Sequence, residues 1–283
     1  MHVKRTKQLL ISFILLLVVL VGCGSDNHAS GEGKVRKVKI AYAQDGKPMS
    51  YKDENGNATG YDVEVMKEVE KLLPEYEFEF VSTSDDDLLI GVQQGKYQAG
   101  VKNAFITDER KEKFIYPKEL LGLSSTGLVL KKENEDITSL ADFASAGLKL
   151  APIAANSAQY SVIETYNQEN PDNQVKLEAS DTFSVDVVQW VNEGRVDGGV
   201  IIESPFQKQV ISEDGPYHHL KDEVVYNEFA MIKTWPLFNK KEQELADAYD
   251  EAIKKLKKDK KLNELSEEFH GRDLFKEMDI AEE

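Results

Sequence analysis

The chain has 283 residues, of which 41% are hydrophobic, with a formal net charge of −16 and a single cysteine. A surface this acidic repels nucleic acid and anionic lipid, which excludes both as binding partners. One cysteine leaves no internal disulfide, so the fold has to depend on hydrophobic cores that need no covalent support. The length suits one large domain or two of ordinary size.

The first 22 residues have the pattern of a secretory signal peptide. Lys4, Arg5 and Lys7 precede an apolar stretch over residues 9–21, which is shorter than the roughly 20 residues that span a bilayer. The stretch ends in Leu-Val-Gly-Cys, and Cys23 stands where a bacterial lipoprotein signal places its lipidated residue. An anchoring helix, or a cleaved signal followed by an incidental cysteine, is the alternative. We therefore expect acylation of Cys23 and a membrane anchor through the acyl chains.

A flexible tether is expected after the cleavage site. Residues 1–22 form the predicted signal peptide, and residues 23–35 include the small, polar, glycine-containing stretch SDNHASGEGK. Residues 1–22 carry three basic residues and no acidic one, so their removal makes the net charge −19. Such a charge suits a body that is held clear of the membrane surface.

Strand patterns alternate with amphipathic helical patterns along the rest of the chain. Short β-rich or alternating runs predict strands at residues 38–42, 76–81, 97–101, 148–153 and 198–202. Apolar spacings of three and four predict helices at residues 61–73, 88–94, 158–168, 185–193, 240–258 and 262–269. This alternation predicts an α/β fold with largely parallel sheets.

A heptapeptide that occurs twice predicts two lobes of similar build. Gly-Lys-Tyr-Gln-Ala-Gly-Val at residues 95–101 is echoed by Gly-Arg-Val-Asp-Gly-Gly-Val at residues 194–200, each between an amphipathic helix and a strand. The first glycine suits the C-cap of the helix, and the cation beside it complements the helix dipole. A helix-to-strand turn favours Gly and a basic residue in any fold, which is the alternative explanation.

Two crossing segments would then connect the lobes and leave a cleft between them. These segments are expected near residues 125–130 and 226–232. On this interpretation residues 36–126 together with 228–275 form the first lobe, and residues 127–227 form the second. The two C-terminal helices cover a lobe, because no third sheet remains for them.

Three motifs resemble those of the family 3 extracellular solute-binding proteins, the receptors that supply polar amino acids to ABC importers. The most specific is Ile-Thr-Asp-Glu-Arg at residues 106–110, followed by Phe-Ile-Tyr-Pro at 114–117. Gly-Tyr-Asp-Val-Glu-Val at 60–65 resembles the stretch that opens the family's first helix, and Gly-Arg-Val-Asp at 194–197 resembles its second-lobe motif. The resemblance covers about residues 38–272. It implies a two-lobed periplasmic-binding-protein-like (type II) fold, whose lobes are joined by two crossing strands and close on the ligand.

The resemblance also implies a ligand site in the cleft. Arg110 would hold the α-carboxylate of an amino acid, and a planar guanidinium with two parallel N–H donors is suited to that role. From its neighbours alone, Arg110 also fits a solvated helix charge. Lys102, Asn103 and Phe105 lie on the strand and turn before that motif, where family members contact the ligand. In the second lobe Ser157 begins a helix whose N-terminus suits a carboxylate, while an ordinary N-cap explains this serine equally well.

The expected partner of the ligand ammonium departs from the family pattern. Relatives place an acid five positions after the residue that corresponds to Asp197, where this chain has Ile202. Glu203 comes next, and a shift of one residue would restore the salt bridge, so we predict that Glu203 binds the ammonium. Asp85 falls where relatives contact the ligand side chain; capping of the following helix by the acids at 85–87 is the alternative.

These features predict a binding protein that catalyses no reaction, uses no cofactor or metal, and is a monomer on the extracellular face of the cell membrane. Lys102 and the nearby acids favour a polar or doubly zwitterionic amino acid such as cystine, with an acidic or amide amino acid as the alternative. We expect the closed form to dock on the permease subunits of an ABC importer. An enzyme similar to the cyclohexadienyl dehydratases, which resemble this family, is the main competing hypothesis. A surface adhesin or sensor is the third.

Overall fold

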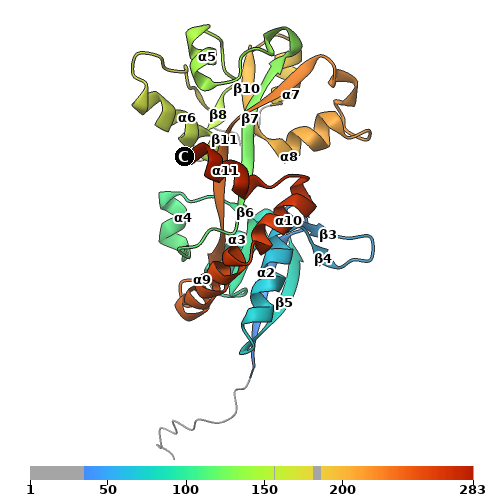
Figure 1. Cartoon of the computed structure of the whole chain (residues 1–283), viewed down its shortest axis with the longest axis vertical. Coiled ribbons are helices and arrows are strands. Elements are labelled where there is room, and N and C mark those ends of the chain that lie inside the picture. The colour runs from blue at the N-terminus through green and yellow to red at the C-terminus, as the bar shows by residue number, and fades with distance from the viewer. Residues whose placement is uncertain (1–34, 156, 181–185, 283) are drawn as a thin grey trace, which may run out of the picture. The chain divides into compact units, whose positions relative to one another are not determined.

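The computed structural model describes residues 35–155, 157–180 and 186–282, apart from the side chains at positions 45 and 279–282. Over these residues strands alternate with helices, as the sequence pattern predicts (Figure 1). The predicted signal peptide, Cys23 and all of the predicted tether except its last residue lie outside the described residues, and so does Asn156. Within the described ranges no helix is both long enough and apolar enough to cross a membrane.

Within the described residues six strands form the main sheet, in the order β10 (Gly198–Ile202), β7 (Gly122–Lys131), β11 (Val224–Phe238), β6, β1 and β5. β1 (Arg36–Ala43) pairs in parallel with β5 (Tyr76–Thr83) and with β6 (Ala99–Ala104). The pairs β11–β6, β11–β7 and β10–β7 are antiparallel. The prediction of a largely parallel sheet is therefore wrong, because the two long central strands run in opposite directions as the chain passes from one lobe to the other and returns.

These two long strands are β7 (Gly122–Lys131) and β11 (Val224–Phe238), which pair along most of the length of β7. The segments expected to cross between lobes, residues 125–130 and 226–232, lie inside them. A register irregularity follows Glu228. Such an irregularity bends a strand and changes the direction of nearby side chains.

The first lobe surrounds one end of the crossing strands (Figure 1). Its elements, besides β1, β5 and β6, are α2 (Tyr61–Leu72), α3 (Asp85–Gln94), α4 (Asp108–Lys113), α9 (Gln243–Lys258), α10 (Lys261–His270) and a small sheet of β2 (Asp45–Gly46), β3 (Ser50–Lys52) and β4 (Ala58–Thr59). The helices predicted at 61–73, 240–258 and 262–269 are confirmed to within a few residues. α2 ends shortly before Pro74, because a proline has no N–H with which to continue the helical hydrogen bonds.

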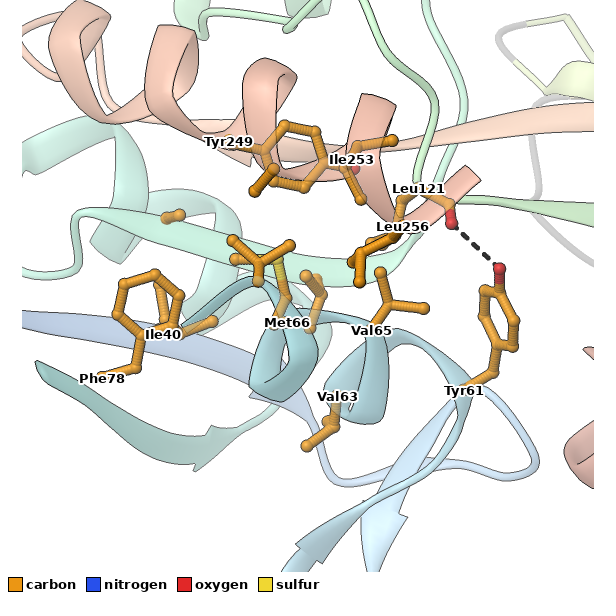
Figure 2. Close-up of a cluster of buried hydrophobic side chains, with 14 of the residues drawn as sticks. Ile40, Tyr61, Val63, Val65, Met66, Phe78, Leu121, Tyr249, Ile253 and Leu256 are labelled. Atoms are coloured by element: carbon orange, nitrogen blue, oxygen red, sulfur yellow. Dashed lines mark hydrogen bonds between the residues drawn. The ribbon is translucent and has the colours of Figure 1, made fainter. Parts of the chain in front are cut away.

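The core of this lobe packs α2 and α9 against one face of the sheet (Figure 2). Ile40, Met66 and Ile253 are fully buried there. Burial of an apolar side chain of this size contributes about 1.5–3 kcal/mol. The Tyr61 hydroxyl, also buried, donates to the carbonyl oxygen of Leu121 at 3.1 Å. This bond joins the start of α2 to the segment that enters β7.

The second lobe surrounds the other end of the crossing strands (Figure 1). Its elements are α5 (Leu140–Ser145), β8 (Ile153–Ala154), α6 (Ala158–Glu169), β9 (Ala179–Ser180), α7 (Val187–Asn192), β10 (Gly198–Ile202), α8 (Glu203–Phe206), the 3-10 helices η1 (Lys132–Asn134) and η3 (His218–Leu220), and the π-helix η2 (Gln207–Ile211). The helix predicted at 158–168 and the strand predicted at 198–202 are confirmed. Position 185 of the helix predicted at 185–193 lies outside the described residues, and α7 covers most of the remaining positions.

The continuous strand predicted at residues 148–153 is wrong: Leu150 forms an isolated parallel bridge with Gly198 of β10, and only Ile153 belongs to a strand, β8. The backbone of Lys149 is held by Asp197 instead, since the Lys149 N–H donates to Asp197 Oδ2 at 2.7 Å. The Lys149 carbonyl accepts from the N–H groups of Asp197 and Gly198 at 2.8 and 3.2 Å. Pro152 has no N–H with which to continue a ladder.

The echoed glycines both terminate helices. Gly95 has φ 79° after α3, and Gly194 has φ 70° after α7. Their N–H groups donate to Val92 and Val191 carbonyls at 3.1 and 3.0 Å. Glycine adopts this left-handed conformation without steric cost, so the helix ends predicted at these positions are confirmed.

α11 (Leu274–Glu282) is absent from the sequence prediction. Gly271, at φ 73°, ends α10, and the Asp273 carboxylate then accepts from the Lys276 N–H at 3.1 Å at the start of α11. Leu274 and Phe275 are buried in the first-lobe core. α11 also contacts β7, so the C-terminal segment lies beside the crossing strands (Figure 1).

Candidate functional site

Two neighbouring cavities are lined by residues of both lobes. The first, here the Lys102 cavity, has a volume of about 470 Å³ and includes Ala43, Lys102 and Asn103 from the first lobe and Ser204 and Pro205 from the second. Ala43 ends β1, and Lys102 and Asn103 lie near the end of β6, so the sheet itself presents these residues to the cavity.

The second, here the Glu203 cavity, has a volume of about 730 Å³. It includes Glu203 at the start of α8, Ser125 of β7 and His270 at the end of α10. Lys47 and Lys208 line both cavities, so the two are adjacent parts of one interlobe cleft.

Asp85 and Lys102, both predicted ligand contacts, meet in the Lys102 cavity. Lys102 Nζ lies 2.6 Å from Asp85 Oδ2, with 11% of the lysine side chain and 59% of the aspartate side chain exposed. The interpretation of the acids as N-caps is wrong, because the Ser84 hydroxyl accepts from the Asp87 N–H at 3.3 Å. The helix therefore begins at Asp85, three residues before its predicted start, and its acids occupy the first turn, where a carboxylate is stabilised by the helix dipole.

Asn103 is held in the left-handed region, at φ 55°, by a buried carboxylate. Its N–H donates to Asp62 Oδ2 at 2.8 Å, and its side-chain oxygen accepts from the Ser124 hydroxyl at 2.8 Å. Asp62 is fully buried and its Oδ1 has no partner within the described part of the chain. Burial raises the pKa of Asp62 to about 7, although the bond from Asn103 opposes the shift.

Arg110 and Phe105 pack on each other at the start of α4. Arg110 Nη1 donates to the Phe105 carbonyl at 3.1 Å, and the guanidinium lies 4.6 Å from the centroid of the Phe105 ring. The Thr107 hydroxyl accepts from the Arg110 N–H at 3.1 Å and caps α4. The Tyr116 hydroxyl donates to the same Phe105 carbonyl at 3.0 Å, and burial raises the pKa of Tyr116 to about 12. Arg110 and Phe105 do not line either of the two cavities defined above.

Ser157 is the N-cap of α6, and its hydroxyl accepts from the Tyr160 N–H at 3.2 Å. The capping alternative drawn from the sequence is therefore confirmed. Ser157 lines a cavity of about 640 Å³ within the second lobe, which shares Ile202, Pro205, Gln209 and Pro216 with the Lys102 cavity. The structure thus groups Lys102, Asn103 and Asp85 in one cavity, and places Ser157 in the cavity that adjoins it.

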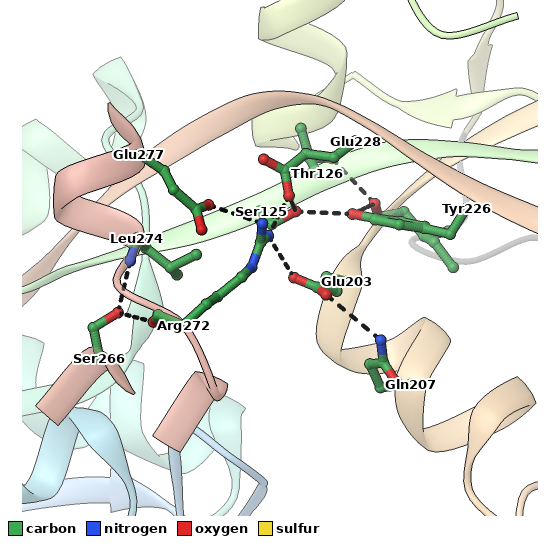
Figure 3. Close-up of polar contacts among 11 residues, drawn as sticks. Ser125, Thr126, Glu203, Gln207, Tyr226, Glu228, Ser266, Arg272, Leu274 and Glu277 are labelled. Atoms are coloured by element: carbon green, nitrogen blue, oxygen red, sulfur yellow. Dashed lines mark hydrogen bonds and ion pairs between the residues drawn. The ribbon is translucent and has the colours of Figure 1, made fainter. Parts of the chain in front are cut away.

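Glu203 is paired with an arginine that the sequence analysis did not identify (Figure 3). Arg272 Nη2 lies 2.9 Å from Glu203 Oε2, and the same guanidinium also pairs with Glu228 and Glu277. No local pattern marks Arg272, because its partners lie on other elements. Asp62 could have been identified, since it precedes Met66 by one helical turn on the apolar face of α2.

His270 is a second residue of the Glu203 cavity that the sequence analysis did not select. Its ring lies 5.4 Å from that of Tyr61, and its Nε2 has no partner among the described residues. Burial, together with the charge of Arg272, lowers the pKa of His270 to about 4. The ring is therefore neutral at physiological pH. Within the described ranges no group of three or more His, Cys, Asp or Glu side chains is arranged to hold a metal ion.

Comparison with known proteins identifies the fold and the family. The chain is 29% identical to the L-cystine-binding protein TcyJ of Bacillus subtilis (strain 168), over 98% of both chains. It is 26% identical to TcyK, an L-cystine-binding protein of the same organism, over 97% of this chain and 99% of that one. These named relatives are binding proteins.

Solved structures show the same two-lobed fold. The probable amino-acid ABC transporter extracellular-binding protein ytmK of Bacillus subtilis has a TM-score of 0.65 at 24% identity, over 83% of this chain and 98% of that one. A putative L-cystine ABC transporter of Listeria monocytogenes has a TM-score of 0.56 at 25% identity, over 83% and 96% of the two chains. The family described as bacterial extracellular solute-binding proteins, family 3, matches residues 38–272. This chain belongs to that family, with a type II periplasmic-binding-protein-like fold.

Proposed function

We propose that this protein is the lipid-anchored receptor of an ABC importer, that it binds a polar amino acid between its lobes, and that it delivers the ligand to the permease. The observation that carries the proposal is the cleft formed by the Lys102 and Glu203 cavities, to which both lobes contribute charged residues. Membership of the solute-binding family supports it. The anchor is the acylated Cys23, as the Leu-Val-Gly-Cys motif predicts.

Arg110 is the proposed partner of the ligand's α-carboxylate. One guanidinium nitrogen, Nη1, donates to a neutral carbonyl, that of Phe105. A carboxylate is a stronger acceptor for a guanidinium than a carbonyl, and it accepts two parallel bonds. Because Arg110 does not line the two cavities in this structure, the proposal requires its side chain to turn from Phe105 toward the ligand as the lobes close.

Glu203 is the proposed partner of the ligand's ammonium. Glu203, Glu228 and Glu277 share a single guanidinium, so the cluster retains an excess of negative charge. A further cation is therefore stabilised next to Glu203. Ser125, whose hydroxyl donates to Glu228 Oε2 at 2.6 Å, lines the same cavity.

A second carboxylate on the ligand is favoured by the cations of the Lys102 cavity. Lys47, Lys102 and Lys208 all line it, with Asp85 as the acid among its lining residues. Lys102 is paired with Asp85, whereas Lys47 and Lys208 form no ion pair within the described part of the chain. L-cystine carries one α-amino-acid group at each end, and two relatives are named L-cystine-binding proteins. We therefore propose cystine as the ligand, with an acidic or amide amino acid as the alternative.

Isothermal titration calorimetry tests the proposal directly. L-cystine, L-glutamate, L-glutamine, L-arginine and L-leucine would each be titrated into the protein. We expect binding of L-cystine, with no measurable binding of L-leucine, because a branched apolar side chain leaves the lysines unpaired. Tight binding of L-leucine, or failure of every amino acid to bind, would contradict the proposal. Loss of a chorismate-pathway intermediate such as prephenate on incubation would indicate an enzyme instead.

A further inference from the structure

Arg272 connects three carboxylates that come from three different elements (Figure 3). Glu203 begins α8 of the second lobe, Glu228 lies on β11, and Glu277 lies on α11. Arg272 Nη2 contacts Glu203 Oε2 at 2.9 Å and also pairs with Glu228, and Nη1 contacts Glu277 Oε2 at 2.8 Å. The guanidinium therefore links the second lobe to a crossing strand and to the C-terminal helix.

The backbone of Arg272 is fixed to the first lobe. The Ser266 hydroxyl donates to the Arg272 carbonyl at 2.9 Å and accepts from the Leu274 N–H at 3.0 Å. Ser266 and Leu274 are buried, and Leu274 belongs to the first-lobe core. Because the Arg272 carbonyl and the Leu274 N–H are both bonded to buried Ser266, the backbone that presents the charge of Arg272 toward Glu203 is held to the first lobe.

Charge is unbalanced at this junction. Three carboxylates face one guanidinium, and the side chains of Glu203, Glu228 and Arg272 are 29%, 30% and 30% exposed. Ser125 and Tyr226, which also border the cluster, are uncharged at neutral pH, and the pKa of Tyr226 is raised, mainly by burial. His270 is neutral as well, since its pKa is lowered to about 4 by burial. Lys47, Lys52 and Lys208 also line the Glu203 cavity but form no ion pair with these carboxylates, so among the described residues Arg272 is the cation in direct contact with Glu203.

We propose that Arg272 is a specificity-determining residue, which excludes ligands with a cationic side chain from the Glu203 cavity. This inference rests on the proposed function, namely that the cavity receives an amino acid. An α-ammonium at Glu203 meets a carboxylate that Arg272 already shares. A ligand whose side chain carries a further positive charge, with no carboxylate of its own to balance it, is repelled by Arg272. Without the guanidinium of Arg272, the three carboxylates would attract that side chain. The two ammonium groups of cystine are each balanced by a carboxylate, so cystine is not excluded on this basis.

Two cysteine derivatives of similar size test the proposal. S-(2-aminoethyl)-L-cysteine has a cationic side chain and S-methyl-L-cysteine a neutral one. The Kd of each would be measured by calorimetry for the full chain and for Arg272→Gln, directly or by displacement of L-cystine, at low ionic strength. We expect the ratio of affinities to shift by about tenfold toward the cationic derivative in Arg272→Gln, which corresponds to about 1.4 kcal/mol. Added salt should reduce the shift, because the groups are partly exposed.

Two further variants separate charge from structure. Arg272→Lys keeps the charge and should leave the ratio near that of the unmodified protein. Glu277→Gln removes one carboxylate without changing Glu203, and should shift the ratio toward the neutral derivative. If Arg272→Gln fails to fold, this opposite shift in Glu277→Gln remains as the test.

Equal weakening of both derivatives in Arg272→Gln would overturn the proposal, because that result describes a purely structural ion pair. An unchanged ratio in both Arg272→Gln and Glu277→Gln would overturn it as well, while the proposed function would stand. If the unmodified protein binds no amino acid, the proposed function fails and this inference fails with it.

Discussion

Asp62 provides a test of how burial controls a charge beside the ligand site. The carboxyl group is fully buried in the first turn of α2, one oxygen accepts from the Asn103 N–H at 2.8 Å, and the other has no partner among the described residues. Desolvation raises its pKa from 3.8 to about 7. The perturbation that we consider is Asp62→Asn, which keeps the shape and the acceptor for Asn103 but cannot ionise.

The sign of the pH effect follows from the direction of the shift. A carboxyl whose pKa is raised in the folded state contributes full stability below its unfolded pKa, near 4, and this contribution is lost as the pH rises toward about 7. Between these values the unfolded chain releases a proton that the folded chain keeps. The slope is at most about 1.4 kcal/mol per pH unit, so the loss between about pH 4.5 and about pH 8 is about 3 kcal/mol.

Urea denaturation at a series of pH values, with ligand absent, measures this loss. The carboxyls of Asp53, Glu109 and Asp142, whose pKa values are lowered mainly by hydrogen bonds, act in the opposite direction. They are present in both proteins, so the difference in free energy of unfolding between Asp62→Asn and the unmodified chain isolates Asp62. We expect the free energy of unfolding of Asp62→Asn, relative to that of the unmodified chain, to increase by about 3 kcal/mol from about pH 4.5 to about pH 8. A difference that stays constant over this range would refute the reasoning, because Asp62 would then titrate alike in both states.

Three further substitutions test the fold, the site and the anchor. Gly122→Ala places a Cβ 2.5 Å from Cε1 of the buried Tyr61, so the free energy of unfolding should fall by about 1–3 kcal/mol; an unchanged urea midpoint would contradict this packing. Arg110→Ala should weaken amino-acid binding by at least about 2 kcal/mol in calorimetry, with little change in the urea midpoint of the ligand-free protein; undiminished affinity would exclude Arg110 as the carboxylate partner. Cys23→Ala should abolish labelling by radioactive palmitate and leave an unprocessed or released protein; membrane retention at the mature size would contradict lipidation.

Much of the element order could be predicted because it depends on short-range patterns. The apolar spacing from Val63 to Leu73 predicts α2, and the alternation of residues 76–81 predicts β5, with Tyr76 and Phe78 buried and Glu77 and Glu79 exposed. The segment at 148–153 does not form one strand, because its backbone hydrogen bonds are divided among Asp197, Gly198 and Glu178, and no local pattern shows these partners. The antiparallel pairing of β7 and β11 also depends on a return of the chain from the second lobe.

The residues of the candidate site could also be predicted only in part from the sequence. Residue types and motifs selected Lys102, Asn103 and Asp85, which the structure brings to one cavity, and Glu203, which lies in the neighbouring one. Their roles toward a ligand stay predictions. Arg110 was selected by its motif, yet its contacts in this structure are with Phe105.

The sequence by itself determined the α/β class, the family and most helix ends, because each depends on periodicity, capping or a motif within a few neighbouring residues. Only the tertiary structure decided which charges meet. The Asp62 carboxylate accepts from the Asn103 N–H, 41 positions away in the chain, and Arg272 pairs with Glu203, 69 positions away. Such pairs form when packing brings distant elements within hydrogen-bond distance, and the charge and burial of each group then depend on all the elements around it rather than on its neighbours in the chain.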